Sequence, residues 1–428
     1  MVSAETIKEI IGSNEDFILK EVGPVVAREG LCLPSGTRKV GVIYGVRRSG
    51  KTFLLYDLFK KHATGALYID FEDERIGDIT VGDLERIKDA FFELKPQLLG
   101  KDECLFLFDE IQNVPGWEKF ARRMVEKERI GIFVAGSSSK ITPRQLHTSL
   151  RGRAWSIALY PFSFPEFLRL KGIDPSRPIY GKGRVLVRSW FMQYLKWGGF
   201  PEIGFSESDF ERTKILGEYL DAMFFKDLVE RFNITNIHLL EALKESLFSS
   251  FSGKFSLASF YRKWKGKFPF SKDMLYSYYR YFMESMLVFE VRLYSPSAYR
   301  RMRNPPKVYL VDPGLGRKLG PQDLGRRLEN LVFIELRRKG RELYYFEEQN
   351  ECDFVVKEDG NKRRAIQVAW ELNEDNRERE INGICQCCRS LGLKHGTIIT
   401  SDQESTEKID GIALRAIPFW KWATQASP

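Results

Sequence analysis

The feature that most constrains this chain is the octapeptide Gly45-Val-Arg-Arg-Ser-Gly-Lys-Thr52, which fits the pattern GxxxxGK[ST]. It follows an apolar run at residues 39–44, which predicts a strand, and precedes residues 51–61, which are typical of a helix. Glycines let backbone N–H groups curl around phosphate oxygens, and the helix directs its positive end at the same anion. The sequence therefore predicts a phosphate-binding loop between a strand and a helix.

Two side chains of this loop have distinct expected roles. Lys51 is expected to reach the β- and γ-phosphates of ATP, and Thr52 is expected to ligate Mg²⁺. ATP and Mg²⁺ are therefore the predicted cofactors. The residues expected to contact the nucleotide are Gly45, Arg47, Arg48, Ser49, Gly50, Lys51 and Thr52.

A second motif, residues 105–110, is an apolar strand that ends in the carboxylates Asp109 and Glu110. Asp109 is expected to lie near the metal at the carboxyl edge of the sheet, and Glu110 to orient and polarise the attacking water. The next apolar strand leads into the polar run 136–139. There the Ser137 hydroxyl is expected to sense the γ-phosphate; the alternative is an ordinary serine loop.

The apolar runs of the first 170 residues predict an α/β fold. Short runs at 66–71, 105–108, 132–135 and 155–160 alternate with helical stretches, which favours a parallel sheet with helices on both faces. The Pro- and Gly-rich stretch 171–178 then marks the end of the first domain.

Composition narrows the class of protein further. The 428 residues, 43% of them hydrophobic, suffice for several folded domains. No run of about 18 uncharged apolar residues occurs, and the first residues do not form a basic-then-apolar leader. The six cysteines are too few and too clumped for a secreted disulfide framework. We therefore expect a cytoplasmic protein without a membrane partner.

The positive charge of the chain is concentrated in one segment. Residues 254–307 contain twelve Lys and Arg but three Asp and Glu, an excess equal to the net charge of +9 of the whole chain. A charge concentrated in this way indicates a polyanion as partner. Because the rest of the chain is balanced, the predicted contact surface lies in this segment.

The pattern of the same segment predicts a winged helix. Helical stretches at 256–265 and 271–286 are followed by strands at 287–294 and 307–311, with a basic loop between the strands. The second helix would enter a DNA groove and the loop would contact phosphates. The predicted DNA-binding residues are Lys263, Lys265, Lys267, Lys272, Arg280, Arg300, Arg301 and Arg303. A protein-interaction module is the alternative.

The order of these motifs resembles the AAA+ ATPases. The strings GVRRSGKT, LFDEIQNVPGWE, AGSSS, LRGRAW, YPFSFPEF, GGFPE, FFKDLVER, ECDFVV and IQVAWEL are similar to those of AAA-type ATPases with a C-terminal domain of restriction-endonuclease type, found mostly in archaea and bacteria. The resemblance spans nearly the whole chain. Together with the patterns above it predicts an AAA+ core at 1–170, a helical lid at 171–236, a winged helix at 237–318 and a restriction-endonuclease-like α/β domain at 319–428.

The resemblance also implies an arginine finger in the string Leu150-Arg-Gly-Arg153. Arg153 is the first candidate and Arg151 the second for reaching the γ-phosphate bound by a neighbouring subunit. A finger supplied in this way requires a homo-oligomeric ring, and the expected ring is a hexamer. The alternative is that both arginines are solvated or pair with local carboxylates.

The last domain carries only part of a nuclease site. Nucleases of the type it resembles hold a metal between an aspartate and an E-x-K motif, often with a glutamate from an earlier helix. Glu329 and Asp353 match that pattern, but Gln367 replaces the metal-binding carboxylate and Ala369 replaces the lysine. We therefore expect a degenerate domain that serves assembly or DNA contact.

The sequence as a whole favours an oligomeric AAA+ ATPase that binds duplex or branched DNA and couples ATP to remodelling of the DNA or movement on it. Two alternatives stay open at this point. One is a slow nucleotide switch that recruits a protein through the winged helix, and the other is an ATP-controlled nuclease.

Overall fold

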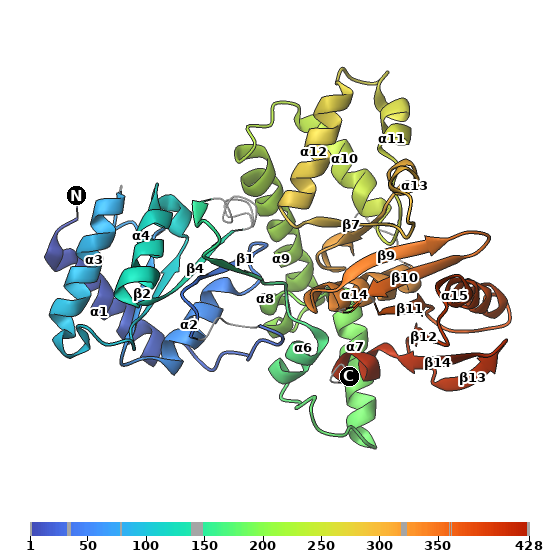
Figure 1. The fold of residues 1–428 in the computed structure, drawn as a ribbon, viewed down its shortest axis with the longest axis horizontal. Helices are drawn as coiled ribbons and strands as arrows, with labels where there is room; N and C mark the ends of the chain where they lie inside the picture. Colours follow the sequence, from blue (N-terminus) through green and yellow to red (C-terminus); the bar gives the residue numbers. More distant parts are fainter. Residues whose placement is uncertain are drawn as a thin grey trace. The chain divides into compact units, whose positions relative to one another are not determined.

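A computed structural model describes residues 2–31, 36–77, 79–137, 149–317, 323–358, 360 and 362–425, with only the backbone described for Ser137. The chain divides into two compact units, Met1–Tyr160 and Pro161–Pro428 (Figure 1). Each unit has its own sheet, and each is described here by itself. The predicted division into four domains stays a prediction.

The first unit is built on a parallel sheet of five strands in the order β2-β3-β4-β1-β5. The strands are β1 (Val40–Gly45), β2 (Ala66–Asp70), β3 (Leu105–Asp109), β4 (Gly131–Ser137) and β5 (Ala154–Ala158). The parallel sheet predicted from the apolar runs is therefore confirmed. β1 lies between β4 and β5, so the strand order switches at β1. Ligands of α/β folds bind at the carboxyl ends of the strands beside such a switch.

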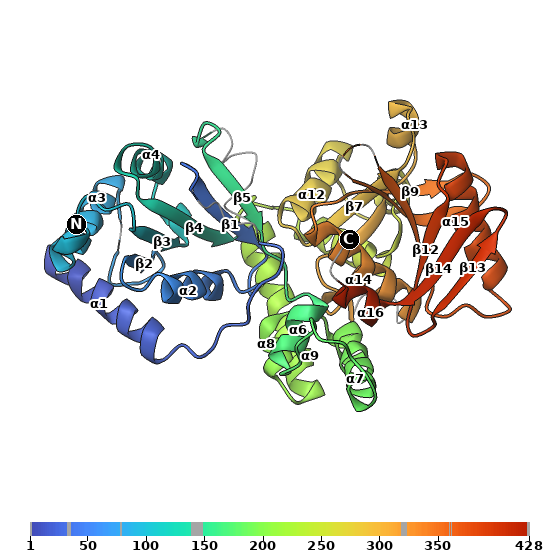
Figure 2. The ribbon, with the colours of Figure 1, turned by 60° about the horizontal axis from the view of Figure 1, so that its bottom comes forward.

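Helices cover both faces of this sheet, and Figure 2 shows α2 and α4 on opposite sides of it. The helices are α1 (Ala4–Lys20), α2 (Lys51–Lys61), α3 (Val81–Leu94) and α4 (Trp117–Arg123), with 3-10 turns at Pro96–Leu98 and Ile111–Asn113 and a π-helix at Met124–Glu128. Strand residues alternate between the two faces: Val42 packs in the cluster of α3 and α4, and Ile43 in that of α2.

The second unit begins with helices α6 (Phe164–Leu170), α7 (Lys182–Trp197), α8 (Pro201–Phe205), α9 (Asp209–Ala222), the π-helix η4 (Met223–Glu230) and α10 (Ile237–Ser249). Aromatic rings join the first two of these, since Phe164 packs against Phe191 and Tyr194. Gly199 N donates to Asp312 Oδ2 at 2.7 Å, which fixes the turn after α7.

The basic segment folds in the predicted order of helices and strands. It contains β6 (Gly253–Lys254), α11 (Leu257–Trp264), α12 (Lys272–Glu284), β7 (Val288–Leu293), α13 (Ala298–Arg303) and β8 (Lys307–Leu310), followed by a 3-10 turn at Leu315–Arg317. The expectation of a loop between β7 and β8 is corrected, because α13 lies there. Ser297 caps this helix by accepting a hydrogen bond from Arg300 N.

The rest of the chain forms α14 (Leu324–Arg338), β9 (Glu342–Glu347), β10 (Glu351–Lys357), β11 (Arg363–Val368), α15 (Arg377–Leu391), β12 (His395–Thr400), β13 (Ser405–Ile409), β14 (Ile412–Pro418) and α16 (Phe419–Thr424). Its sheet has the order β13-β14-β12-β11-β10-β9-β7-β8-β6. The sequence predicts a domain boundary at residue 318. Since β7 pairs with β9, strands from both sides of that boundary share one nine-stranded sheet (Figure 1).

Candidate functional site

The phosphate-binding loop joins β1 to α2, and two of its glycines are required by its shape. Gly50 has φ of +96°, a backbone conformation that residues other than glycine rarely adopt. A Cβ on Gly45 would lie 2.0 Å from the carbonyl oxygen of Leu159. Gly50 therefore permits the turn into α2, and Gly45 permits the close contact with the backbone at Leu159; phosphate binding by the loop stays a prediction.

Lys51 is the first residue of α2, and its side chain turns back into the loop. Its Nζ donates to the carbonyl oxygens of Gly45 and Val46, both at 3.1 Å. The residue is buried. The ammonium group thus lies inside the turn that is predicted to hold phosphate.

Thr52 and Asp109 meet at the carboxyl edge of the sheet, where Thr52 Oγ1 donates to Asp109 Oδ2 at 2.6 Å. Burial, together with the charges of Glu110 and Asp70, raises the pKa of Asp109 to about 6, although the hydrogen bond from Thr52 and the charge of Lys51 act to lower that pKa. A hydroxyl and a carboxylate at this distance are the hard oxygen ligands that Mg²⁺ prefers. The residues present therefore fit a magnesium ion.

Glu110 follows Asp109 directly and adopts the left-handed conformation, with φ of +47°. Its backbone N–H donates to Asp109 Oδ1 at 3.1 Å, and its carboxylate accepts a hydrogen bond from the Gln112 amide. A non-glycine residue in this conformation is strained, and such strain is common at functional sites.

Three residues that the sequence did not single out also lie at this site. Asp70 ends β2 directly opposite Asp109, and burial raises its pKa. Tyr68 donates to Asp109 Oδ2 at 3.4 Å, and Arg28 Nη1 donates to the carbonyl oxygen of Ser49 at 2.9 Å. Asp70 could have been found as another carboxylate that ends an apolar strand. Nothing in the pattern around Arg28 indicates its contact with the loop.

The other residues with predicted roles in hydrolysis are Ser137, Arg153 and the second finger candidate Arg151. Ser137 ends β4 opposite Gly45, but its side chain is outside the described residues. Arg153 Nε pairs with Glu126 Oε1 at 2.9 Å, with 48% of its side chain exposed. Arg151 is exposed and has φ of +48°. The arginine finger stays a prediction, since Arg153 contacts a local carboxylate in this chain.

The predicted DNA-binding residues differ in exposure. Arg301 is half-buried, because its guanidinium donates to the carbonyl oxygens of Ser295 and Pro296. The others are exposed and together define what we call the basic surface: Lys263, Lys265, Lys267, Lys272, Arg280, Arg300 and Arg303. Aromatic rings underlie part of it, since Lys267 Nζ lies 4.6 Å from the Trp264 ring centre and Lys272 Nζ lies 5.4 Å from that of Tyr261.

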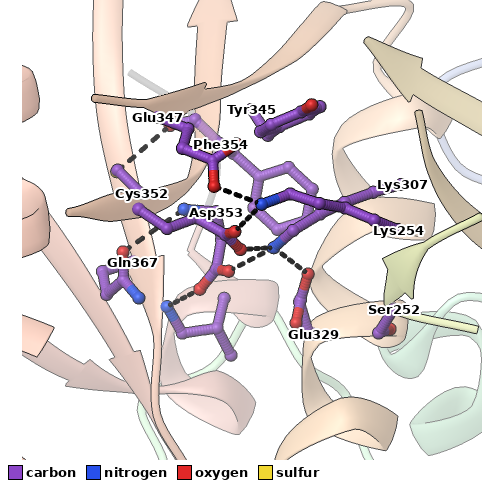
Figure 3. A network of polar contacts seen from close by, with 12 residues as sticks. Ser252, Lys254, Lys307, Glu329, Tyr345, Glu347, Cys352, Asp353, Phe354 and Gln367 are labelled. Carbon is purple, nitrogen blue, oxygen red and sulfur yellow. Dashed lines mark hydrogen bonds and ion pairs between the residues drawn. The ribbon is translucent and has the colours of Figure 1, made fainter. Parts of the chain in front are cut away.

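Two lysines of the same segment, Lys254 and Lys307, pair with carboxylates and do not belong to the basic surface. Lys254 Nζ pairs with Glu347 at 2.6 Å and Glu351 at 2.7 Å, and Lys307 Nζ lies among Glu329, Glu351 and Asp353 (Figure 3). The positive charge of the segment is therefore divided between the basic surface and a carboxylate cluster.

The partial nuclease pattern is brought together in space. Glu329 from α14 and Asp353 from β10 both contact Lys307, and Gln367 Oε1 accepts from the Asp353 N–H at 3.2 Å. Burial acts to lower the pKa of Lys307, but the charges of Asp353 and Glu329 outweigh it and raise that pKa well above its ordinary value. Sequence reasoning missed Lys307 and Glu351 because neither belongs to the motif.

Comparison with known families defines the class of protein. The AAA domain family matches residues 37–168, which contain the loop from Gly45 to Thr52 and the carboxylates Asp109 and Glu110. Domains of unknown function match residues 188–327 (DUF8612) and 324–422 (DUF4143). With the loop, Thr52 and Asp109 in the geometry above, the chain is an AAA-type ATPase.

Two curated relatives span most of the chain. The uncharacterized protein MJ1544 of Methanocaldococcus jannaschii is 35% identical over 401 residues, which are 90% of this chain and 88% of that protein. An uncharacterized protein of Haemophilus influenzae is 27% identical over 395 residues, 89% of this chain and 94% of that one. The chain therefore belongs to the same family as MJ1544.

Solved structures show only distant overall likeness. The Walker-type ATPase PABY2304 of Pyrococcus abyssi is 16% identical, with a TM-score of 0.42 and coverage of 69% of this chain and 98% of that one. The RuvB Holliday junction branch migration motor of Thermotoga maritima is 14% identical, with a TM-score of 0.26 and coverage of 71% and 95%.

None of the helices in the described part of the chain has both the length and the apolar character needed to cross a bilayer.

Proposed function

We propose that this AAA-type ATPase binds duplex or branched DNA and couples ATP hydrolysis to remodelling of that DNA or movement on it. In the proposed reaction Lys51 contacts the transferred phosphate, Thr52 and Asp109 hold Mg²⁺, and Glu110 orients the attacking water. The hydrogen bond between Thr52 and Asp109 supports this assignment because it brings the two metal ligands together.

The observation that carries the DNA part is the basic surface. Its seven exposed cations lie on α11, α12, α13 and the turn between α11 and α12, which carries Lys265 and Lys267. The two remaining lysines of the segment, Lys254 and Lys307, pair with carboxylates. The order α10, β6, α11, α12, β7, β8 is typical of a winged helix, in which α12 would be the helix that enters the groove. These cations would then contact phosphates on either side of the groove.

Salt dependence of DNA binding tests this proposal. Replacing Lys265, Lys267 and Lys272 together with Ala should weaken binding about equally for unrelated sequences. It should also make the log–log salt slope shallower by up to about 3, since each phosphate contact contributes about 0.9. ATP binding should be unchanged, because the loop around Lys51 belongs to the other unit.

The matched control replaces Lys394, Lys408 and Arg415, which are exposed outside the basic surface, with Ala. This variant loses the same formal charge and should bind DNA with the parent slope. Equal slopes for all three proteins would contradict the proposal and favour a surface that docks a protein.

We further propose that the chain works as a homo-oligomeric ring, a hexamer, in which Arg153 exchanges Glu126 for the γ-phosphate of a neighbouring subunit. The half-exposed side chain of Arg153 supports this role. Mixing Arg153→Ala subunits with Lys51→Ala subunits should restore part of the activity that each variant lacks alone. A fully active monomer would contradict the ring.

A further inference from the structure

Lys307 is a buried cation at the centre of three carboxylates. It lies on β8 with 3% of its surface exposed. Its Nζ is 2.8 Å from Asp353 Oδ1 and 3.1 Å from Glu329 Oε1 (Figure 3). The same Nζ is 2.6 Å from Glu351 Oε1. An ammonium group has three N–H donors, so each of them has a carboxylate acceptor here.

The carboxylates are also held by further donors. Glu329 Oε1 accepts from the Tyr309 hydroxyl at 2.7 Å, and Asp353 Oδ2 accepts from the Val368 N–H at 2.9 Å. Glu351 Oε2 pairs with Lys254 at 2.7 Å. The lysine therefore completes a network in which each acid already has a second partner.

These residues do not fit the divalent metal that the nuclease resemblance implies. Lys307 Nζ contacts Glu329 and Asp353, the two carboxylates that would hold the metal. Gln367, at the position of the third ligand, accepts from the Asp353 N–H and donates to Glu380 Oε2 at 2.6 Å. A positive charge bonded to both carboxylates repels a divalent ion and occupies the oxygens that such an ion would need.

We propose that the Lys307 ammonium replaces the metal ion, so that the carboxylate cluster is a metal-free junction between β8, α14 and β10 and not a centre for phosphodiester cleavage. Asn330 supports the junction independently, because its side chain accepts from Leu310 N at 2.8 Å and donates to Leu310 O at 3.0 Å. The same helix and the same strand are thus joined by two sets of buried polar contacts. The cation comes from the basic segment itself, which anchors that segment to the C-terminal sheet.

Counting bound Mn²⁺ on the full-length, nucleotide-free chain tests this inference. Wild-type protein and Asp353→Asn should bind the same number of ions, because the cluster holds none. Lys307→Ala should bind one additional ion per chain, since three carboxylates then surround a vacated space. Lys307→Ala combined with Asp353→Asn should lose that ion again. Any Mn²⁺ bound near Asp109 is common to all these proteins and cancels in the comparison.

Lys254→Ala is the matched control, because it removes a lysine from the same network at a position that does not contact Glu329 or Asp353. It should bind no additional Mn²⁺. Mn²⁺ should raise the melting temperature of Lys307→Ala. It should shift the melting temperatures of Lys254→Ala and of wild type by the same, smaller amount.

Two outcomes would overturn the inference. The first is an Mn²⁺ ion on the wild-type chain that Asp353→Asn removes, or cleavage of DNA by wild type that the same substitution abolishes; neither measurement depends on the folding of Lys307→Ala. The second is a folded Lys307→Ala protein that binds no more Mn²⁺ than wild type.

Discussion

Two buried lysines, Lys51 in the first unit and Lys307 in the second, show how the partners of one residue type decide its use. Lys51 donates to backbone carbonyl oxygens of a loop, and Lys307 contacts three carboxylates. Neutral carbonyl groups can give up an ammonium to an arriving phosphate at small cost. Carboxylates in a buried cluster cannot, because they would be left with uncompensated charge. The first lysine is therefore suited to a ligand and the second to a fixed junction.

The largest expected effect separates the two lysines by stability. Lys307→Met should lower the free energy of unfolding of the second unit by about 3–5 kcal/mol, because it leaves buried carboxylates without their cation. Lys51→Met is the matched substitution and should cost less, within about 1 kcal/mol, since the hydrogen bonds from Lys51 Nζ to Gly45 and Val46 end on neutral carbonyl groups. Urea unfolding of both variants measures the difference. Equal losses would mean that the two environments do not differ as described.

The next effect concerns the carboxylate beside the first lysine. Glu110→Gln should retain ATP binding but slow turnover by about 10²-fold or more, because the amide cannot polarise the attacking water. Lys51→Ala should lose ATP binding as well. Phosphate release and nucleotide binding, measured on the same preparations, distinguish these variants. Wild-type turnover by Glu110→Gln would show that another group activates the water.

A smaller effect is expected from pH. Burial raises the pKa of Asp109 to about 6, and a metal ligand must be ionised to bind. The affinity for Mg²⁺ and ATP together should therefore be full above pH 6 and decrease by up to about tenfold per pH unit below it. Asp109→Asn is the control, because the titration of Asp109 is removed while Asp70 and the nucleotide still titrate in that variant. Parallel profiles for the two proteins between pH 5 and 7 would contradict the assignment of Asp109.

The raised pKa of Asp109 also makes the stability of the fold depend on pH: its contribution decreases as pH rises, whereas that of a salt-bridged carboxylate increases. The pKa of Asp109 in the folded chain, about 6, lies above the ordinary value of 3.8, so the folded state binds the proton more tightly. This contribution is favourable below about pH 4 and is lost as pH rises through 6. In the absence of Mg²⁺, Asp109→Asn should therefore gain stability relative to wild type above pH 6.

The smallest effect lies within the basic segment. Arg303→Ala should make the salt slope of DNA binding shallower by about 0.9, since its exposed side chain can contact a phosphate. Arg301→Ala should change the slope less, because its guanidinium is bonded to the carbonyl oxygens of Ser295 and Pro296. Equal changes from both would show that Arg301 leaves these carbonyls when DNA binds.

The nucleotide-binding site was predictable because its signals are local. The loop from Gly45 to Thr52 is one continuous pattern, and Asp109 follows an apolar strand directly. Parallel pairing then brings the carboxyl ends of these strands to one edge, which is a general property of such sheets. The helix α13 was missed although Ser297 is a good N-cap, since the Arg- and Pro-containing sequence around it is also typical of a loop.

The carboxylate cluster was only half predictable because its contacts are distant in sequence. Glu329 and Asp353 belong to a pattern, but Lys307 comes near them through the pairing of β7 with β9, which places β8 and β10 in one sheet. Ala369 stands where the motif would have its own lysine. No sequence pattern could show that a lysine from a neighbouring strand lies among the same acids. Arg28 is similar, since its contact with the loop depends on how residues before the first strand fold back.

We expect Mg²⁺ and nucleotide to bind at the site of Lys51, and Lys307 to exclude a metal from the carboxylate cluster. Counting Mn²⁺ ions on the full-length chain saturated with a non-hydrolysable ATP analogue tests both expectations together. One tightly bound ion per chain is expected, which is lost in Lys51→Ala together with the nucleotide and is retained in Asp353→Asn. An ion that survives Lys51→Ala but disappears in Asp353→Asn would contradict both.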